Sequence, residues 1–370
     1  MITLNRIIIQ GYKSISNLDL QLSSVNILIG INGSGKSNFI STFTLLNHLV
    51  EKNLQAFIGK MGGADNLLFF GRKVTDEIFL KLVFGQNAYE VKLTPTSEDS
   101  LIFESEICTY QDRHHETPFN LILGSGHKET KLYSEIKQRQ QKGMKKGVAD
   151  YVLEKMLEWK VFHFHDTSEN AKIKQSCDIN DNTKLRPDAS NIAAFLFMLQ
   201  NKYPENYNKI VSTVQLAAPF FDDFSLHESA LNSEKILLEW REKGSDKYFN
   251  AHALSDGTLR FICLTTLLLQ PELPSLIVID EPELGLHPYA IRLLGELLQS
   301  AGNQTQVILA TQSVTLVDQF TADNVILVNK MEKHSSFERV NSEAIAEWLQ
   351  DYSLGELWEK NVLGIRGDNE

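Results

Sequence analysis

The stretch from Gly30 to Asn38, GINGSGKSN, decides the fold class of this chain. From Gly30 to Ser37 it matches G-x-x-x-x-G-K-[ST], the complete pattern of a phosphate-binding loop. Residues 25–29 before it are apolar and largely β-branched, and residues 38–50 after it carry apolar side chains at helical spacing. Because such a loop must join a buried strand to the start of a helix, this context favours a phosphate site over a chance match in a flexible Gly/Ser segment.

The residue types of the loop suit a nucleotide. Its glycines let backbone N–H groups turn inward around a phosphate, and the helix that follows adds the partial positive charge of its N-terminus. Lys36 can reach the β- and γ-phosphate oxygens, and the Ser37 hydroxyl can ligate magnesium. We therefore expect ATP and Mg2+ as cofactors. The loop residues expected to hold them are Gly30, Asn32, Gly33, Ser34, Gly35, Lys36, Ser37 and Asn38.

A phosphate loop needs a carboxylate partner, and residues 276–281 (LIVIDE) supply one. Four consecutive apolar residues predict a buried strand that delivers Asp280 to the edge of a sheet, where it can hold magnesium. Glu281 follows directly and can polarise an attacking water molecule. The pair therefore predicts hydrolysis and not binding alone.

Between these motifs lies LSDGT at residues 254–258. Ser255 is a good residue type to cap the helix expected from Leu259 onward, and the turn exposes N–H groups at a helix start. This makes an anion site possible, although any helix cap can look similar.

Length and composition bound the class of protein. With 370 residues and 42% hydrophobic side chains, the chain can bury a sizeable core. Cys108, Cys177 and Cys263 are odd in number and widely separated, so we expect no disulfide framework and a cytoplasmic location. No apolar run is long enough to span a membrane. The net charge of −11 argues against a broadly basic nucleic-acid binder, although a local basic surface could still contact phosphates.

The rest of the pattern predicts an α/β protein with two kinds of sheet. Strand-like runs at 2–9, 18–22, 77–84, 89–93 and 101–110 predict an N-terminal antiparallel layer near the phosphate-loop helix. Fully apolar strands at 276–279, 307–310 and 325–329 alternate with helices and predict a parallel sheet covered on both faces. A further strand is predicted at 236–241. We expect a nucleotide-binding core made of residues 1–125 and 245–370, split by a helical lobe or insertion at 126–244.

Residues 128–159 are helical in pattern and rich in lysine and arginine, with Gly143 and Gly147 as interruptions. This predicts a helical hairpin that projects from the body. Two interpretations stay open: a solvated charged face, which is the commoner origin of a charge run, or a basic surface for nucleic acid or an acidic partner.

Taken in order, the phosphate loop, LSDGT, LIVIDEP and ATQS at 310–313 resemble the motifs of the ABC-class ATPases. The variants EPELGLHP (281–288) and ATQS, with the opening IIIQGYKSISNLDLQL (7–22), are similar to the RecF, SMC and OLD branch of that class. HFHDTS at 163–168 also resembles stand-alone prokaryotic ATPases of this branch, often described as AAA-family or RecF-like. The resemblance implies an ABC-type ATPase head.

In this family two heads close over two nucleotides, and the signature residues of one head, here Ser255 and Gly257, contact the γ-phosphate held by the other. The resemblance therefore implies a homodimer through the ATP sites, possibly a higher oligomer. It also implies catalytic roles for Lys36, Glu281 and Gln312, and metal ligation by Ser37 and Asp280. Gln312 stands where many members carry a switch histidine, and glutamine can hydrogen-bond but cannot take a charge.

Three further positions follow the family less closely. His287 replaces the usual D-loop aspartate, as the LHP form does in this branch. Arg6 and Lys13 fall near the place where the branch contacts the base or phosphates of the nucleotide. The family's lid glutamine has residues 62–66 as a candidate region.

Only about 60 residues follow Gln312, so we expect no Toprim nuclease domain. The interval of roughly 220 residues between the loop and LSDGT holds no long heptad array, so no SMC-scale coiled coil is expected.

These observations predict an ATP-dependent dimeric clamp or switch in DNA repair or anti-phage defence, acting on DNA or with a partner effector such as a nuclease or toxin. The alternative is a scaffold in which ATP stabilises an oligomer that sequesters or presents such an effector, with incidental hydrolysis. A third hypothesis is a metal-dependent hydrolase that uses His163 and His165, completed by Cys177 or Asp178. The Asp280-Glu281 pair favours the first.

Overall fold

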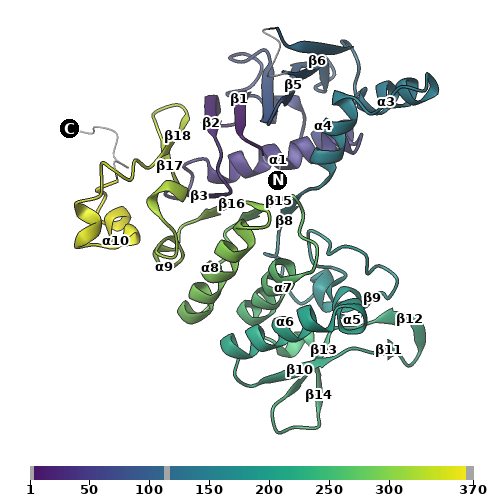
Figure 1. The fold of residues 1–370 in the computed structure, drawn as a ribbon, viewed down its shortest axis with the longest axis vertical. Helices are drawn as coiled ribbons and strands as arrows, with labels where there is room; N and C mark the ends of the chain where they lie inside the picture. Colours follow the sequence, from purple (N-terminus) through teal and green to yellow (C-terminus); the bar gives the residue numbers. More distant parts are fainter. Residues whose placement is uncertain (1–3, 112–116, 364–370) are drawn as a thin grey trace.

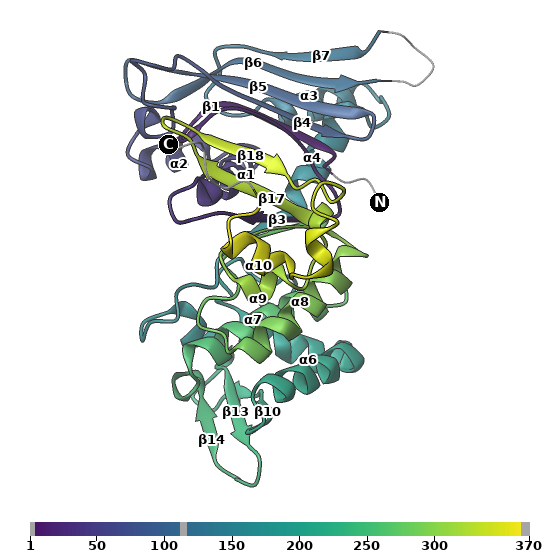
Figure 2. The same ribbon diagram turned by 90° about the vertical axis from the view of Figure 1, so that its left-hand side faces the viewer.

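The computed structural model describes residues 4–111 and 117–363. Two six-stranded sheets lie one above the other, with the helix of the phosphate loop between them, and a lobe of helices and short strands extends from the lower sheet (Figure 1). Figure 2 shows the same sequence of layers from the side, with the antiparallel sheet at one end and the lobe at the other. This is the antiparallel layer, parallel core sheet and helical lobe that the sequence predicts.

The upper sheet is antiparallel throughout, with the strand order β2-β1-β4-β5-β6-β7. Buried side chains alternate with half-buried ones along β4 and most of β5, as a sheet with one covered face requires. The strands are β1 (Arg6–Tyr12), β2 (Ile15–Gln21), β4 (Ile78–Phe84), β5 (Asn87–Pro95), β6 (Leu101–Tyr110) and β7 (Phe119–Gly124).

The lower sheet has the order β18-β17-β3-β16-β15-β8 and is parallel except for β18 at one edge. The parallel order brings the carboxyl ends of β3, β16, β15 and β8 to one edge, where a ligand site of an open α/β sheet is expected. The strands are β3 (Val25–Ile29), β8 (Trp159–Phe162), β15 (Leu276–Asp280), β16 (Gln306–Thr311), β17 (Val325–Lys330) and β18 (Ser335–Arg339).

The two faces of the parallel sheet belong to two different hydrophobic cores. Along β3, Leu28 packs upward with α1 (Lys36–Val50), whereas Ile27 and Ile29 pack downward with α7 (Asp256–Leu269) and α8 (Pro288–Gly302). Because both faces are covered, every residue of β3 is buried and the strand is a continuous apolar run apart from Asn26.

The remaining helices divide between the two cores. The described helices are α2 (Leu54–Lys60), α3 (Leu132–Gln141), α4 (Val148–Leu157), α5 (Ile192–Lys202), α6 (Pro204–Ala217), α9 (Val314–Val317) and α10 (Leu354–Glu359). Short 3-10 turns lie at Ala64–Asn66, Lys172–Lys174, Ala251–Ala253, Ala322–Asn324 and Trp348–Gln350. The lobe contains α5, α6 and two three-stranded sheets, ordered β10-β13-β14 and β11-β12-β9. Their strands are β9 (Cys177–Asp178), β10 (Phe221–Ser225), β11 (Glu228–Ser229), β12 (Asn232–Ile236), β13 (Glu239–Glu242) and β14 (Tyr248–Asn250).

Two predicted strands differ from the structure. The run at 2–9 begins in residues 1–3, outside the described part of the chain, and its strand continues to Tyr12 because pairing with β2 and β4 extends past the apolar residues. The run at 236–241 was predicted as one strand and is two, since β12 ends at Ile236 and β13 begins at Glu239. Strands β7 and β18 and helix α10 were not predicted from the sequence.

The helical hairpin of α3 and α4 is present, as predicted, with α3 extending from the body (Figure 1). It packs with the core, however, because Leu132 and four buried residues of α4 lie in the same cluster as α1. Strand β8 likewise pairs with β15 in the parallel sheet. The packing therefore places residues 126–162 with the nucleotide-binding core, and the chain leaves that core for the lobe after β8.

Two expected absences concern the described residues. No helix in the described ranges is long and apolar enough to cross a membrane. Cys108 and Cys263 are buried, Cys177 is half-buried, and none of the three forms a disulfide.

Candidate nucleotide-binding and hydrolysis site

The phosphate loop lies between the end of β3 and the first turn of α1, as its sequence predicts. Gly33 and Gly35 have φ angles of 77° and 116°, in the region that favours glycine. A Cβ at Gly35 would lie 2.1 Å from the Ser335 Oγ, and one at Gly30 would lie 2.2 Å from the Val328 carbonyl oxygen. The loop therefore needs glycine both for its curvature and for close packing against β17 and β18.

The side chain of Lys36 hydrogen-bonds to the backbone of its own phosphate loop. Its side-chain nitrogen donates to the carbonyl oxygens of Gly30, at 2.7 Å, and Ile31, at 3.1 Å, and the residue is only 4% exposed. Burial lowers the pKa of Lys36, and the charges of Glu281, Asp280 and Glu283 act in the opposite direction. A buried ammonium facing carboxylates and carbonyl oxygens is ready to exchange these partners for phosphate oxygens.

Asp280 ends β15 and faces the loop. The Ser37 hydroxyl hydrogen-bonds to its carboxylate, and burial, the larger effect, raises the pKa of Asp280. The Oδ1 atom is buried and has no hydrogen-bond partner among the described residues. An unsatisfied carboxylate oxygen beside an exposed hydroxyl is a donor set that Mg2+ prefers, so the residues present fit this ion.

Glu281, Gln312 and Asn32 come together from three segments of the chain. The Gln312 side-chain amide donates to the Glu281 Oε1 at 2.7 Å and also to the Asn32 Oδ1. Glu281 has a φ of 42°, an unfavourable value for a residue with a Cβ, and its N–H donates to the Ala310 carbonyl at 2.8 Å. The backbone thus holds Glu281 at the carboxyl end of the sheet, joined through one amide to the phosphate loop.

Glu283 is a site residue that the sequence analysis missed. Its Oε1 accepts from the Thr311 hydroxyl at 2.5 Å and from the Gln312 N–H at 3.1 Å, so it fixes the turn that presents Gln312. Burial raises the pKa of Glu283. The available signal was a second acid two residues after Glu281, in a segment of otherwise apolar and turn residues.

Asn38 and Lys13 join the first turns of α1 to the turn between β1 and β2. The Asn38 amide donates to the Ser14 Oγ at 2.7 Å, and the Lys13 ammonium donates to the Ser41 Oγ at 2.9 Å. Lys13 therefore lies beside the phosphate-loop helix. Arg6, at the other end of β1, forms an ion pair with Asp19 instead, so the sequence grouping of Arg6 with Lys13 does not hold in space.

His163 and His165 leave β8 beside the same sheet edge. The register pairs Phe162 with Ile279, which places His163 next to Asp280, and both imidazoles favour the ionised form of that carboxylate. Burial lowers the pKa of His163, and its backbone N–H donates to the Pro187 carbonyl at 2.9 Å. Within residues 4–111 and 117–363 no group of three or more His, Cys, Asp or Glu side chains could hold a metal ion. The two histidines thus occupy the junction between core and lobe.

Ser255 and Gly257 lie on the opposite face of the parallel sheet from the phosphate-loop helix. Ser255 caps α7 by accepting from the Thr258 N–H at 3.1 Å, and it is exposed. A Cβ at Gly257 would lie 2.1 Å from the Gly285 carbonyl oxygen, so the first turn of α7 touches the loop that follows Glu281. In the described structure neither residue hydrogen-bonds to the phosphate loop of its own chain.

The family described as "AAA domain, putative AbiEii toxin, Type IV TA system" matches residues 25–318, which span the site from β3 to α9. The chain belongs to this family. It is an ABC-class P-loop ATPase of the RecF/SMC branch.

Curated relatives match a smaller part of this ATPase. It is 31% identical over 126 residues to a "Putative ABC transporter ATP-binding protein" of Methanosarcina acetivorans, covering 31% of this chain and 45% of the relative. It is 33% identical over 121 residues to the DNA replication and repair protein RecF of Aliivibrio fischeri strain MJ11, covering 30% and 33%. The matched stretches span less than half the length of these relatives.

Solved SMC heads share the fold over nearly the whole chain. A crystal structure of an SMC head bound to the C-winged helix domain of ScpA aligns with a TM-score of 0.56 and 15% identity, covering 93% of this chain and 99% of that one. An SMC head domain from Pyrococcus furiosus, with an extended coiled coil, aligns with a TM-score of 0.53 and 14% identity, covering 95% and 99%. At these identities the likeness establishes the architecture.

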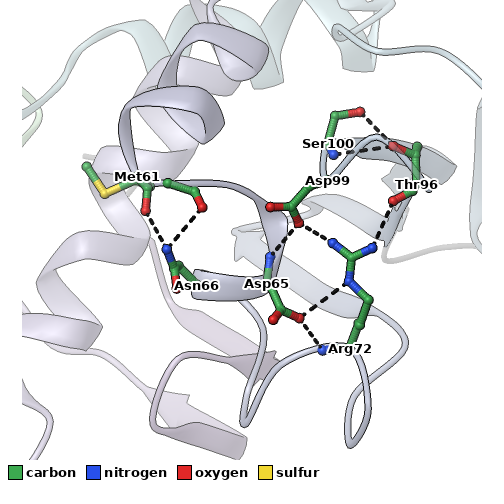
Figure 3. Close-up of polar contacts among 8 residues, drawn as sticks. Met61, Asp65, Asn66, Arg72, Thr96, Asp99 and Ser100 are labelled. Carbon is green, nitrogen blue, oxygen red and sulfur yellow. Dashed lines mark hydrogen bonds and ion pairs between the residues drawn. The ribbon is translucent and has the colours of Figure 1, made fainter.

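The candidate lid region at 62–66 does not directly precede the lobe along the chain. It lies between α2 and β4, where Asp65 and Asp99 hold Arg72 and the Asn66 amide donates to the Met61 and Gly62 carbonyls (Figure 3). The chain enters the lobe more than 90 residues later, after β8. His287, the D-loop variant, is exposed and caps α8 by accepting from the Tyr289 N–H at 3.3 Å.

Proposed function

We propose that this protein binds ATP with Mg2+ and hydrolyses it in a homodimer, as a nucleotide-controlled clamp or switch in DNA repair or anti-phage defence that works with DNA or a partner effector. The observation that carries the proposal is the single amide of Gln312, which joins Glu281 to Asn32 of the phosphate loop. A carboxylate that is merely structural has no reason to be connected to the γ-phosphate end of this loop.

Each residue has a physical role in this proposal. Lys36 would exchange its carbonyl partners for phosphate oxygens, and Ser37 and Asp280 would hold Mg2+, which offsets negative charge on the phosphates. Glu281 would orient the attacking water and accept its proton, and Gln312 would keep the Glu281 carboxylate in place. The phosphate-loop backbone, with the N-terminus of α1, would stabilise the charge that develops during transfer.

The position of the signature supports a dimer. Ser255 is exposed and lies across the sheet from α1, so it cannot complete the nucleotide site of its own chain without a large rearrangement. A second copy related by a twofold axis would bring Ser255 and Gly257 of each head to the phosphate loop of the other. Hydrolysis would then depend on association of the two chains.

The first experiment measures ATP hydrolysis against protein concentration for the wild type and for Ser255→Arg. A composite site predicts a rate per subunit that rises with concentration in the wild type and stays near background in the variant. A rate per subunit that is independent of concentration in both proteins would contradict the dimeric site.

Glu281→Gln separates the switch from an ATP-stabilised scaffold. The switch predicts a variant that binds ATP, remains dimeric and loses hydrolysis by roughly 10²–10⁴-fold, with altered function in cells. The scaffold predicts unaltered function in cells, because only occupancy of the site would matter. Light scattering with ATP, a phosphate-release assay and a complementation test in cells read out the three properties.

A second observation favours nucleic acid as a ligand of the switch. Lys137, Lys142 and Lys145 on the hairpin are exposed and form no ion pair with the described residues, in a chain of net charge −11. The base of the hairpin is rigid: the Glu106 carboxylate accepts from the Lys131 N–H at 2.9 Å and from the His127 Nε2 at 2.8 Å. Free cations on an anchored support suit the phosphate backbone of DNA.

Duplex binding tests this surface. Changing Lys137, Lys142 and Lys145 together to Gln should weaken binding of a fluorescent duplex and reduce the salt dependence by up to about 0.9 in log K per log salt for each lost phosphate contact. The matched control changes three exposed lysines of the lobe, Lys184, Lys202 and Lys209, to Gln. Equal losses in both triple variants would point to net charge alone and contradict a role for the hairpin.

A further inference from the structure

Arg260 is a buried cation on the signature helix that the proposed chemistry does not use. It lies on α7, five residues after Ser255, and is only 5% exposed. Its guanidinium donates to three backbone carbonyls: Phe164 through Nε at 2.9 Å, His165 through Nη2 at 3.2 Å, and Leu284 through Nη1. Among the described residues it forms no ion pair with a carboxylate.

The three carbonyls belong to two segments that border the nucleotide site. Phe164 and His165 follow β8, whose last residue pairs with Ile279 next to Asp280. Leu284 belongs to the turn that begins at Glu281, where the Leu284 N–H donates to the Glu281 carbonyl at 3.2 Å. One side chain thus connects the segment beside the magnesium carboxylate with the turn that carries the water-orienting carboxylate.

The other end of this connection is the signature. Arg260 lies little more than one helical turn from Ser255, so a shift of its guanidinium moves the start of α7 as a unit. Gly257, in the first turn of α7, also packs closely against Gly285 of the turn at 281–285: a Cβ at Gly257 would lie 2.1 Å from the Gly285 carbonyl oxygen. Movement of the turn at 281–285 therefore reaches Ser255 through both contacts.

The chemistry of the contact requires arginine. Removing a cation from water is costly, and here the cost is offset by three carbonyl dipoles in direct contact and by the nearby charge of Asp256, without a direct ion pair among the described residues. The planar guanidinium directs its N–H groups along fixed directions toward three acceptors, whereas a lysine ammonium at the end of a flexible stem cannot reproduce that fork. A hydrophobic residue of similar volume would fill the space and leave the three carbonyls of these two segments without this donor.

We propose that Arg260 is a positioning residue that couples the nucleotide site of one chain to the Ser255 that this chain presents to the second chain. The inference rests on the composite dimeric site proposed above. The guanidinium of Arg260 contacts backbone carbonyls of the described residues. It sets the position of the signature according to the state of the segments beside Asp280 and Glu281.

The test uses mixtures of inactive variants, because a dimer with two composite sites allows cis and trans defects to be separated. Arg260→Lys alone should bind ATP normally and lose hydrolysis on the order of a hundredfold, the effect expected of a mispositioned catalytic group. Mixed equally with Glu281→Gln, it should recover about a quarter of the wild-type rate, because half of the dimers have one complete site out of two. Mixed with Ser255→Arg, it should recover nothing, because both variants then lack a working signature.

The opposite pattern would overturn the inference. If Arg260 acted on its own Glu281, the mixture with Ser255→Arg would recover activity and the mixture with Glu281→Gln would not. The pair of Ser255→Arg and Glu281→Gln is the positive control, and failure of that pair contradicts the composite site itself. Failure of the Arg260 mixtures alone contradicts only the role of Arg260.

Two further variants guard against simple loss of folding. Arg260→Gln removes the buried charge while keeping an amide donor, so it should fold and show the same mixing pattern. Thr266→Val changes a buried side chain of α7 whose hydroxyl has no partner among the described residues, and it should leave hydrolysis unchanged. Thermal unfolding and ATP affinity are measured for each variant, and equal losses of hydrolysis in Thr266→Val and Arg260→Gln would reduce the effect of Arg260 to helix stability.

Discussion

The phosphate-loop side and the signature side of this ATPase differ in how far each is completed within one chain. On the first side Lys36 is 4% exposed and held by two carbonyls, and one amide joins Glu281 to Asn32. On the second side Ser255 is exposed, and among the described residues its side chain hydrogen-bonds within its own helical turn, to Thr258. In the dimeric site proposed above, this difference separates nucleotide binding, which one chain provides, from hydrolysis, which requires the second chain.

The largest effect is expected when the buried Lys36 ammonium is removed. Lys36→Ala should weaken ATP binding by about 30-fold or more, because truncating one partner of a buried charge interaction costs 2–5 kcal/mol. Binding of a fluorescent ATP analogue by the monomer measures the effect. Lys209→Ala, at an exposed position in the lobe, is the control. Equal affinity in both variants would contradict the assignment of Lys36 to the phosphates.

On the signature side we expect a substitution to preserve ATP affinity and to reduce hydrolysis. Ser255→Arg should keep ATP affinity within about twofold and lose hydrolysis on the order of a hundredfold, since one group that stabilises developing charge is replaced by a side chain too large for the interface. Ser255→Thr preserves the helix cap and should retain most of the activity. A loss of affinity in Ser255→Arg monomers would show that the two sides are not independent.

Substitutions of Gln312 should have a smaller effect on hydrolysis and test the phosphate-loop side. Gln312→Ala should lower hydrolysis by about fivefold with little change in ATP affinity, because a net hydrogen bond of about 1 kcal/mol that fixes Glu281 is lost. Gln312→Glu should be worse, since it places a like charge beside Glu281. Single-turnover rates measure both, and a harmless Gln312→Glu would argue against direct contact with the carboxylate during reaction.

The smallest predicted effect is on stability. Burial raises the pKa of Glu283 in the native state above the ordinary value of 4.5. Between the unfolded-state pKa and the higher native pKa, the native state binds more protons than the unfolded state. The free energy of unfolding therefore falls as pH rises through that window. Glu283→Gln removes this loss and should raise the melting temperature at neutral pH by about 1–2 °C. Hydrolysis should survive in Glu283→Gln, which keeps the acceptor for Thr311, and fall in Glu283→Ala.

Much of the fold could be predicted because its strands are local patterns. The run at 25–29 is apolar apart from Asn26, as expected of a strand covered on both faces. The edge strands β7 and β18 were missed because the sequence pattern of an edge strand is weaker than that of a strand covered on both faces. The hairpin at 128–159 was predicted as helices, but its packing against α1 was not visible, since no periodicity shows which face of which element covers it.

The candidate site divides in the same way. Lys36, Ser37, Asp280 and Glu281 are announced by motifs, because phosphate and Mg2+ chemistry restricts both residue type and spacing. Glu283 and Arg260 have no such motif. Their importance comes from burial and from the backbone groups they reach, which are as much as 96 residues away along the chain.

By itself the sequence determined that this chain carries a phosphate loop on a strand and helix, with a partner carboxylate at the end of a second buried strand. Only the tertiary structure decided that Gln312 joins Glu281 to the loop, that His163 borders Asp280, and that Ser255 lies across the parallel sheet from α1. The physical reason is that a motif lies within one short segment, so its residue types and their spacing can be read directly from the sequence. Distances between segments are set by the packing of two cores on the two faces of one sheet.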